Sequence, residues 1–257
     1  MTAATLANPG KLKIIGRAGV GTDNIDVKVA NEKGVLVINT PQGNAAAAAE
    51  LAIGLMFALA RKIPGADASM KRGEWEKKKF MGVEIAGKTL GVVGLGNIGR
   101  NAASRGVGLG MNVLGYDPFP PKELPAGVKL VSFDEIVAKS DFVTLHVPLT
   151  DTTKNLFNAE TFAKMKKGSY IINCARGGVV DESAVLPALE SGQLAGAALD
   201  VFGKEPPEPT PMFKHDNLIA SPHLGASTKE AQEKVAIELA EVFIGFLKDG
   251  IVKNAVK

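Results

Sequence analysis

The stretch Leu90–Arg100, Leu-Gly-Val-Val-Gly-Leu-Gly-Asn-Ile-Gly-Arg, decides the fold of this chain. Its first four residues form an apolar run that predicts a buried parallel strand. A second apolar run, 113–116, is followed by Asp117, eighteen residues beyond the last glycine of the stretch. The order strand, glycine turn, helix, strand, acid is the fingerprint of a dinucleotide-binding unit. The glycines follow the pattern G-x-G-x-x-G: Gly94, Gly96 and Gly99.

The spacing of these residues has a chemical reason. Gly94 permits a tight turn, Gly96 lets the backbone approach a pyrophosphate, and Gly99 lets helix and strand pack closely. The helix N-terminus supplies free N–H groups for the phosphates. The carboxylate of Asp117 can accept hydrogen bonds from ribose hydroxyls and repels the extra phosphate of NADP, which predicts NAD as the ligand. The alternative, a glycine-rich turn without a ligand, leaves the acid and the second strand unexplained.

Composition sets broad limits on the class of protein. The chain has 257 residues, 46% hydrophobic and 22% charged, as in a soluble globular protein of one large or two modest domains. A formal charge of +3 gives no argument for nucleic acid or membrane binding. A single cysteine, Cys174, cannot form an internal disulfide, and the N-terminus does not resemble a signal peptide. We expect a cytoplasmic protein without a metal site.

The segment 45–60 is apolar apart from Glu50. It is too short for a confident membrane span and predicts a buried helix with Asn44 as its N-cap. A helix that is apolar all round must be covered on nearly every side. The cover can be a subunit interface or the rest of the same chain, and the sequence favours neither.

Beyond this segment, short apolar runs alternate with helical patterns, which predicts an open, mostly parallel α/β sheet. The segment 63–82 is polar and basic, and we interpret it as solvated surface. Pro187 should kink or shorten the helix that contains it. A capping box at 227–230 opens a long amphipathic helix that ends at Gly250. Strands are expected at 11–15, 35–38, 90–93, 113–116, 142–147, 170–173, 197–201 and 218–220, and further helices at 26–33, 132–138, 159–164 and 182–190.

Reactive side chains follow three of the expected strands. Arg176, Glu205 and His223 come after the runs 170–173, 197–201 and 218–220, so they should meet at one edge of the sheet. Hydride transfer between a hydroxy acid and NAD needs a base, which a histidine supplies near neutral pH. A carboxylate beside the histidine fixes its tautomer, and an arginine can hold a substrate carboxylate. Taken singly, each residue is better explained as an ion pair or a loop cap, whereas three of them converging beside a dinucleotide site favour the catalytic interpretation.

Other candidates for the chemistry are weaker. His146 ends a strand and His215 lies in a polar loop, whereas Pro222 and Gly225 shape a loop around His223. No base stands next to Cys174, so we interpret it as a small buried residue at a strand end.

Several of these motifs resemble the D-2-hydroxyacid dehydrogenases. They cover the segments 91–100, 173–178, 198–202, 205–207 and 221–228. Two further stretches, 17–21 and 75–82, narrow the resemblance to members that oxidise 3-phospho-D-glycerate to 3-phosphohydroxypyruvate with NAD, the first step of phosphorylated serine biosynthesis. The alternatives are a glyoxylate or hydroxypyruvate reductase, and an NAD-sensing interaction protein like the corepressors of this fold.

The resemblance implies a role for each matching residue. His223 is the general acid/base, Glu205 its partner and Arg176 the substrate binder. Asp117 contacts the ribose and Asp200 the nicotinamide carboxamide. The expected cofactor-binding set is Gly94, Gly96, Asn97, Ile98, Gly99, Asp117, His146, Pro148, Cys174, Ala175, Asp200 and Gly225. The expected substrate-binding set is Arg17, Gly19, Val20, Gly21 and Lys77, the last reaching across a dimer.

The resemblance also implies an organisation into domains. We expect a Rossmann-type doubly wound NAD-binding domain at 41–226 and an incomplete flavodoxin-like substrate domain at 1–40 and 227–257. The chain reads as an N-terminally truncated core of such an enzyme, in which NAD binding persists and substrate binding is weakened. It should form a homodimer through helix 44–62, or a tetramer at full length. The alanines at 45–49 replace a stretch that usually carries a hydroxyl residue.

Overall fold

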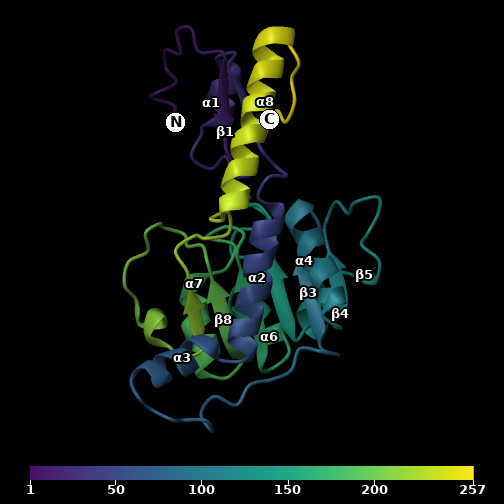
Figure 1. Ribbon diagram of the computed structural model, residues 1–257, viewed down its shortest axis with the longest axis vertical. Helices are drawn as coiled ribbons and strands as arrows, with labels where there is room; N and C mark the ends of the chain where they lie inside the picture. Colours follow the sequence, from purple (N-terminus) through teal and green to yellow (C-terminus); the bar gives the residue numbers. More distant parts are fainter. Residues whose placement is uncertain (257) are drawn as a thin grey trace. The chain divides into compact units, whose positions relative to one another are not determined.

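The computed structural model describes residues 1–256, and the chain divides into two compact units (Figure 1). The larger unit is Ala48–Gly225, and the smaller one joins Met1–Ala47 to Ala226–Lys257.

The larger unit is built on a parallel sheet of seven strands in the order β5-β4-β3-β6-β7-β8-β9. The order reverses between β3 and β6, and this switch point is where open α/β sheets bind ligands. The sheet confirms the expected doubly wound class. Its strands are β3 Thr89–Val93, β4 Asn112–Tyr116, β5 Val128–Leu130, β6 Phe142–Leu145, β7 Ser169–Asn173, β8 Leu194–Leu199 and β9 Leu218–Ala220.

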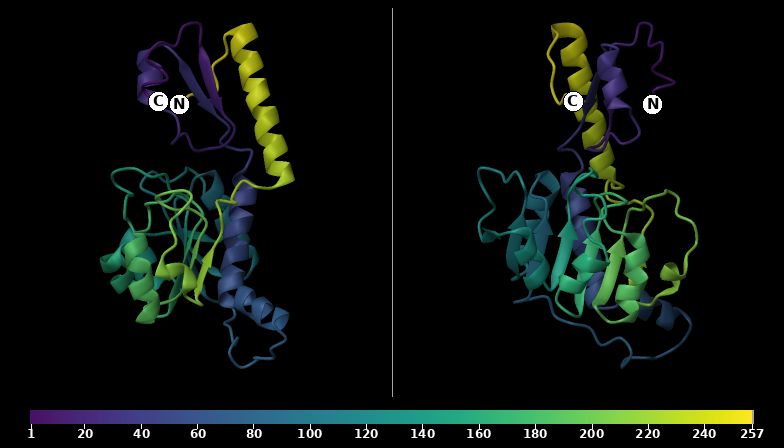
Figure 2. Two further views of the ribbon diagram at one scale, coloured as in Figure 1. Left: turned by 90° about the vertical axis from the view of Figure 1, so that its left-hand side faces the viewer. Right: turned by 180° about the vertical axis from the view of Figure 1, so that it is seen from behind.

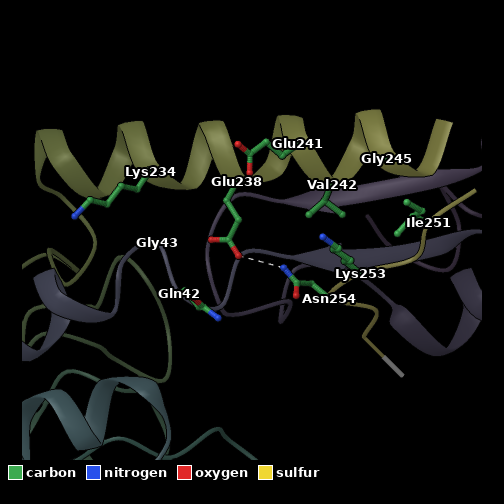
Figure 3. Close-up of a pocket in the computed structure, with 10 residues that line it drawn as sticks. All are labelled: Gln42, Gly43, Lys234, Glu238, Glu241, Val242, Gly245, Ile251, Lys253 and Asn254. Atoms are coloured by element: carbon green, nitrogen blue, oxygen red, sulfur yellow. Dashed lines mark hydrogen bonds between the residues drawn. The ribbon is translucent and has the colours of Figure 1, made fainter. Parts of the chain in front are cut away.

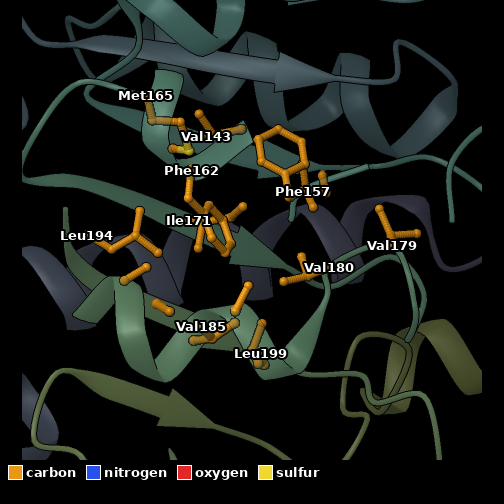
Figure 4. Close-up of a cluster of buried hydrophobic side chains, with 14 of the residues drawn as sticks. Val143, Phe157, Phe162, Met165, Ile171, Val179, Val180, Val185, Leu194 and Leu199 are labelled. Atoms are coloured by element: carbon orange, nitrogen blue, oxygen red, sulfur yellow. The ribbon is translucent and has the colours of Figure 1, made fainter. Parts of the chain in front are cut away.

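Alternating side chains divide between the two faces of this sheet. Ile172 packs with α2 (Ala45–Ala60) and α4 (Asn97–Gly108) on the face that is in front in Figure 1. Its neighbour Ile171 packs on the other face, in the cluster of Figure 4. That second face is covered by α5 Phe133–Lys139, α6 Ala159–Lys164 and α7 Glu182–Glu190. Because both faces are covered, the central strands β3, β6, β7 and β8 are mostly apolar rather than alternating.

Helix α2 is covered mainly by its own chain. Within it, Glu50 and Gly54 are exposed, while most of its alanine, leucine and methionine side chains are buried. The predicted cap is wrong, because Oδ1 of Asn44 is buried without a hydrogen-bond partner among the described residues. Among residues 1–256, no helix is both long and apolar enough to cross a membrane.

Three elements of the structure were not predicted from the sequence. They are β5, the helix α3 (Ile63–Lys71) and the short 3₁₀ helix η1 (Pro211–Lys214). β5 is three residues long and carries a lysine, so no apolar run marks it. The segment 63–82 is largely exposed, as expected, although its first part is helical and has a proline in its first turn. α7 keeps its full expected length in spite of Pro187.

The smaller unit has a two-stranded parallel sheet of β1 (Ile14–Arg17) and β2 (Leu36–Asn39). Helix α1 (Val27–Glu32) packs against one face and α8 (Lys229–Asp249) against the other (Figure 2). The expected amphipathic character of α8 is confirmed, since Val242 is buried and Leu239 and Phe246 are half-buried against this sheet.

The ends of α8 follow elementary capping rules. Its cap is Thr228 rather than the predicted Ser227, because Oγ1 of Thr228 accepts the backbone N–H of Ala231 at 3.1 Å. At the other end, Gly250 adopts a left-handed conformation and terminates the helix as expected. Beside α8 lies an open cavity of about 460 Å³, in which Glu238 accepts a hydrogen bond from Asn254 (Figure 3).

Candidate active site

The carboxyl ends of the central strands lie in one row. Val93 of β3 is in register with Leu145 of β6, which is in register with Asn173 of β7. Asn173 is in register with Leu199 of β8, and Leu199 with Ala220 of β9. The residues that directly follow these five positions therefore emerge at one edge of the sheet. They are Gly94, His146, Cys174, Asp200 and Ser221.

The glycine turn after β3 is fixed by close backbone approaches. Gly94 has φ +91°, and a Cβ placed there would lie 2.4 Å from the carbonyl oxygen of His146. A Cβ on Gly99 would lie 1.8 Å from the carbonyl oxygen of Gly94. Both positions therefore require glycine for the turn itself.

Gly96 differs from the other two glycines. It caps α4 without a side-chain hydrogen bond, and a Cβ there would meet nothing within 4 Å. Glycine at the cap leaves room for a phosphate at the N-terminus of α4, where backbone N–H groups can donate to it. Asn97 and Ile98, also expected at the cofactor, form the half-buried first turn of α4.

Asp117 joins β4 to the glycine turn. Its Oδ2 accepts the backbone N–H of Leu95 at 2.7 Å, and its Oδ1 accepts that of Phe119 at 2.8 Å. A carboxylate can accept about four hydrogen bonds, so each oxygen keeps a position for a ribose hydroxyl. The N-terminus of α4 with glycine at its cap, the glycine turn and this half-buried acid fit NAD.

Glu205 and His223 form a hydrogen-bonded pair. Oε2 of Glu205 lies 2.7 Å from Nδ1 of His223, and Oε1 accepts the backbone N–H of Phe202 at 3.1 Å. The His223 side chain is 51% exposed, so it faces solvent while its Nδ1 is held. With Nδ1–H donated to the carboxylate, Nε2 carries the lone pair that accepts a proton.

Arg176 sits on a turn that Asn173 closes. Oδ1 of Asn173 accepts the N–H of Ala175, and its Nδ2 donates to the carbonyl of Arg176, both at 3.0 Å. Nη1 of Arg176 donates to the Ala175 carbonyl at 2.6 Å. A Cβ on the next residue, Gly177, would lie 1.9 Å from the Phe202 carbonyl oxygen, so the loop after β7 touches the loop that leads to Glu205.

Asp200 is fully buried and holds the loop that follows β9. Its Oδ1 accepts from the hydroxyl of Ser221 at 2.6 Å and from the N–H of Leu224 at 2.8 Å. Its Oδ2 accepts the N–H of Gly225 at 2.9 Å. This loop carries His223, so Asp200 connects β8 to the histidine.

Two further expected cofactor residues, His146 and Cys174, are uncharged at neutral pH. Burial lowers the pKa of His146 to about 4, and its Nε2 lies 3.0 Å from Oγ1 of Thr144. Burial, with the charge of Asp200 nearby, raises the pKa of the Cys174 thiol well above its usual range. Cys174 is therefore a protonated thiol at a strand end.

The remaining expected residues fall in both units. Pro148 is exposed after β6. Lys77 is exposed on the segment after α3. Arg17 ends β1 in the smaller unit, where its Nε donates to the carbonyl of Gly21 at 3.3 Å. Gly19 and Val20 lie in the same turn, and the N–H of Gly19 donates to Oγ1 of Thr40 at 2.6 Å.

The sequence reasoning missed part of the framework around Glu205. Oε1 of Glu182, the first residue of α7, accepts the N–H of Gly203 at 2.6 Å. The hydrogen bonds by which Asp200 holds the loop after β9 were also not predicted. These contacts could have been predicted from an acid at the end of a buried strand, because a buried carboxylate needs hydrogen-bond donors nearby.

Fold and site together define a dinucleotide-binding domain with a histidine–carboxylate pair at its strand ends. A family model described as D-isomer specific 2-hydroxyacid dehydrogenase, NAD binding domain, matches residues 53–225. The chain therefore belongs to the D-isomer-specific 2-hydroxyacid dehydrogenase family, and NAD is its cofactor, as the sequence predicted.

Relatives with curated names agree with this family. The chain is 52% identical over 250 residues to D-3-phosphoglycerate dehydrogenase of Homo sapiens, an alignment of 96% of this chain and 47% of that protein. It is 49% identical over 259 residues to D-3-phosphoglycerate dehydrogenase of Methanocaldococcus jannaschii, covering 100% and 49%. The chain thus spans about half the length of these relatives.

Solved structures give the same fold. A glyoxylate reductase from Paecilomyes thermophila matches with a TM-score of 0.93 at 35% identity, over 99% of this chain and 78% of that one. An NAD-dependent formate dehydrogenase from Staphylococcus aureus, in complex with NAD, matches with 0.91 at 31% identity, over 100% and 79%.

Proposed function

We propose that this chain forms the catalytic core of an enzyme that transfers a hydride from 3-phospho-D-glycerate to NAD, giving 3-phosphohydroxypyruvate. The observation that carries the proposal is the hydrogen bond of 2.7 Å between Glu205 and His223, at the same sheet edge as the glycine turn. The identity of about half of all residues to dehydrogenases named for phosphoglycerate supports the choice of substrate.

The residues of the chain divide the chemistry among them. Nε2 of His223 takes the proton of the substrate hydroxyl, while Glu205 stabilises the imidazolium that forms and keeps the ring oriented. The guanidinium of Arg176 binds the substrate carboxylate. NAD, when bound, accepts the hydride from the carbon that carries the hydroxyl group. In the reverse direction, His223 returns its proton to the carbonyl oxygen of the keto acid, which becomes the hydroxyl group.

The cofactor is held by the glycine turn and the acid that follows β4. The N–H groups at the start of α4 would bind the pyrophosphate, and Asp117 would bind the adenosine ribose. We propose that the other predicted residues line the same cofactor, with Asn97 and Ile98 near the pyrophosphate and Pro148 and Ala175 along the strand ends.

We propose that the smaller unit belongs to a substrate-binding domain. One edge of β1 has no strand partner among the described residues, and Ile237, Ile244 and Leu247 form an exposed apolar face on α8. An unpaired strand edge is typical of a sheet that pairs with further strands, and an exposed apolar helix face is typical of a helix that packs against further structure. The turn 17–21 would then contact substrate.

We propose a homodimer as the assembled form. Since α2 is largely covered within its own chain, we assign the contact with a second copy to exposed apolar side chains on the neighbouring segment. There Trp75 is 80% exposed and Met81 79% exposed, with Ile63 and Met70 also exposed. A second copy on this segment would bring Lys77 close to the partner, where its ammonium group could meet a substrate phosphate.

The proposal is tested by following NADH formation by the purified chain with 3-phospho-D-glycerate. We expect NAD-dependent turnover that falls about a hundredfold or more in His223→Gln. His215→Gln is the matched control and should leave turnover unchanged. A chain that forms no NADH with this substrate, or a His223→Gln variant within a few-fold of the parent, contradicts the proposal.

A glyoxylate reductase is the second candidate, because a solved enzyme of that name shares 35% identity with this chain. Glyoxylate, hydroxypyruvate and D-glycerate therefore belong in the same assay. Faster turnover of these unphosphorylated compounds than of 3-phospho-D-glycerate would favour it. NAD binding without any turnover would favour the NAD-sensing interaction protein.

A further inference from the structure

We infer that Asp200 is a positioning residue, which holds His223 in the orientation that Glu205 requires. The inference rests on the proposed function, in which His223 moves the proton. It gives Asp200 a task inside the protein, in addition to the nicotinamide contact that the family resemblance implies.

Asp200 has no exposed surface, and a buried carboxylate is unfavourable unless hydrogen bonds compensate it. The compensation comes entirely from one loop, through Ser221, Leu224 and Gly225. Three of about four acceptor positions of the carboxylate are therefore filled by the protein itself.

The three groups that donate to Asp200 lie on both sides of His223 in the chain. Ser221 precedes His223 by two residues, and Leu224 and Gly225 follow it directly. The backbone N–H of His223 also donates to the carbonyl oxygen of Asp200, at 2.8 Å. The histidine is thus fixed on both sides, and at its own amide, by a single residue at the end of β8.

The backbone of His223 is strained. His223 has φ +55°, a left-handed conformation that residues other than glycine rarely adopt. Such a conformation persists only where the surroundings impose it, and the four hydrogen bonds to Asp200 impose it here. In this conformation Nδ1 of His223 reaches Oε2 of Glu205.

Glu205 is positioned from the same strand end. Its Oε1 accepts the N–H of Phe202, two residues after Asp200, and Glu182 binds the N–H of Gly203. Both members of the catalytic pair are therefore placed relative to β8. The loss of the Asp200 charge should release the histidine while leaving the glutamate in place.

The test uses the three histidines of the chain as probes. Imidazole NMR spectra, assigned with single His→Gln variants, report the Nδ1 proton of His223 and its tautomer. In Asp200→Asn, the new amide NH₂ would face the N–H of Gly225. We expect the downfield, hydrogen-bonded Nδ1 proton signal of His223 to disappear and the carbon-bound ring proton signals of His146 and His215 to stay. Asp216→Asn, an exposed matched change, should leave the His223 signal unchanged.

A second variant keeps the test decisive if Asp200→Asn does not fold. Ser221→Ala removes one of the donors, and we expect a weakened, faster-exchanging His223 signal. An unchanged Nδ1 signal in a folded Asp200→Asn chain, or in Ser221→Ala when Asp200→Asn is unfolded, overturns the inference. Because this readout needs neither NAD nor substrate, its failure is separate from a failure of the proposed function.

Activity and cofactor binding give the complementary readout. A misplaced base should lower kcat at saturating NAD by about a hundredfold in Asp200→Asn, whatever the loss of the nicotinamide contact does to the Kd for NAD. A large rise in the Kd for NAD with unchanged kcat at saturating NAD would assign Asp200 to the nicotinamide alone and contradict the positioning role.

Discussion

Nδ1 of His223 lies 2.7 Å from Oε2 of Glu205, although eighteen residues separate them in the chain. The pair predicts the effect of removing the carboxylate charge. Glu205→Gln should lower kcat/KM for the hydroxy acid by about 10²-fold or more, because the imidazolium loses its stabilising partner. Glu208→Gln, an exposed change on the same loop, is the control. Equal activity of the two variants would contradict the role of Glu205.

Two glycines of the turn should respond in opposite ways to alanine. At Gly96 a Cβ meets nothing within 4 Å and φ is −65°, so Gly96→Ala should keep the stability of the parent. The new methyl group would occupy the space that the pyrophosphate needs, so we expect NAD affinity to fall about tenfold or more. Calorimetric titration with NAD measures this change, and unchanged affinity would remove the phosphate site from this turn.

Gly99→Ala should instead destabilise the larger unit. Its Cβ would lie 1.8 Å from the carbonyl oxygen of Gly94, which backbone atoms cannot absorb without a shift. We expect a loss of about 2–3 kcal/mol in the free energy of unfolding, measured by urea denaturation. A variant as stable as Gly96→Ala would show that the close approach does not exist.

His146 predicts a specific loss of stability in acid. Burial lowers its pKa in the folded chain from 6.5 to about 4, so protons bind the unfolded chain more readily between these values. Its contribution is therefore complete above pH 6.5 and is lost as the pH falls through about 4, by up to about 3 kcal/mol.

The contribution of His146 to the free energy of unfolding is isolated by comparing His146→Gln with the parent at several pH values. Unfolding is followed in urea. Other groups titrate equally in both chains, so the difference between them reports His146. Parallel curves for the two chains would mean that the imidazole titrates normally.

The proximity of Glu205 and His223 could be predicted from the sequence because parallel strands end at a common edge. Glu205 and His223 follow neighbouring strands, so their proximity depended only on locating two apolar runs. The glycine turn and Asp117 were predictable for the same reason: their spacing is dictated by backbone approach and by the distance between adjacent strands.

Other features depend on backbone conformation that no pattern records. The hydrogen bonds of Asp200 require the loop 221–225 to turn its N–H groups inward, and a local motif does not specify this. Asn44 has the residue type of a cap, yet its Oδ1 finds no donor among the described residues. β5 is too short and too polar to stand out, because its pairing with β4 rather than its composition makes it a strand.

Cys174 should be unreactive in the folded chain. Burial and the nearby Asp200 charge raise its pKa, so at neutral pH the thiol stays protonated and poorly nucleophilic. We expect a maleimide to label it at least about a hundredfold faster in urea than in buffer. As the chain has one cysteine, the mass of the intact protein reports this directly. Rapid labelling of the folded chain would contradict its burial.

The central claim, an NAD site built on the glycine turn and Asp117, is tested most directly by calorimetric titration of the purified chain with NADH and, in parallel, with NADPH. We predict saturable binding of one NADH per chain and binding of NADPH that is about tenfold weaker or more, because the Asp117 carboxylate repels the additional phosphate. The absence of saturable NADH binding, or equal affinity for the two nucleotides, would contradict the account.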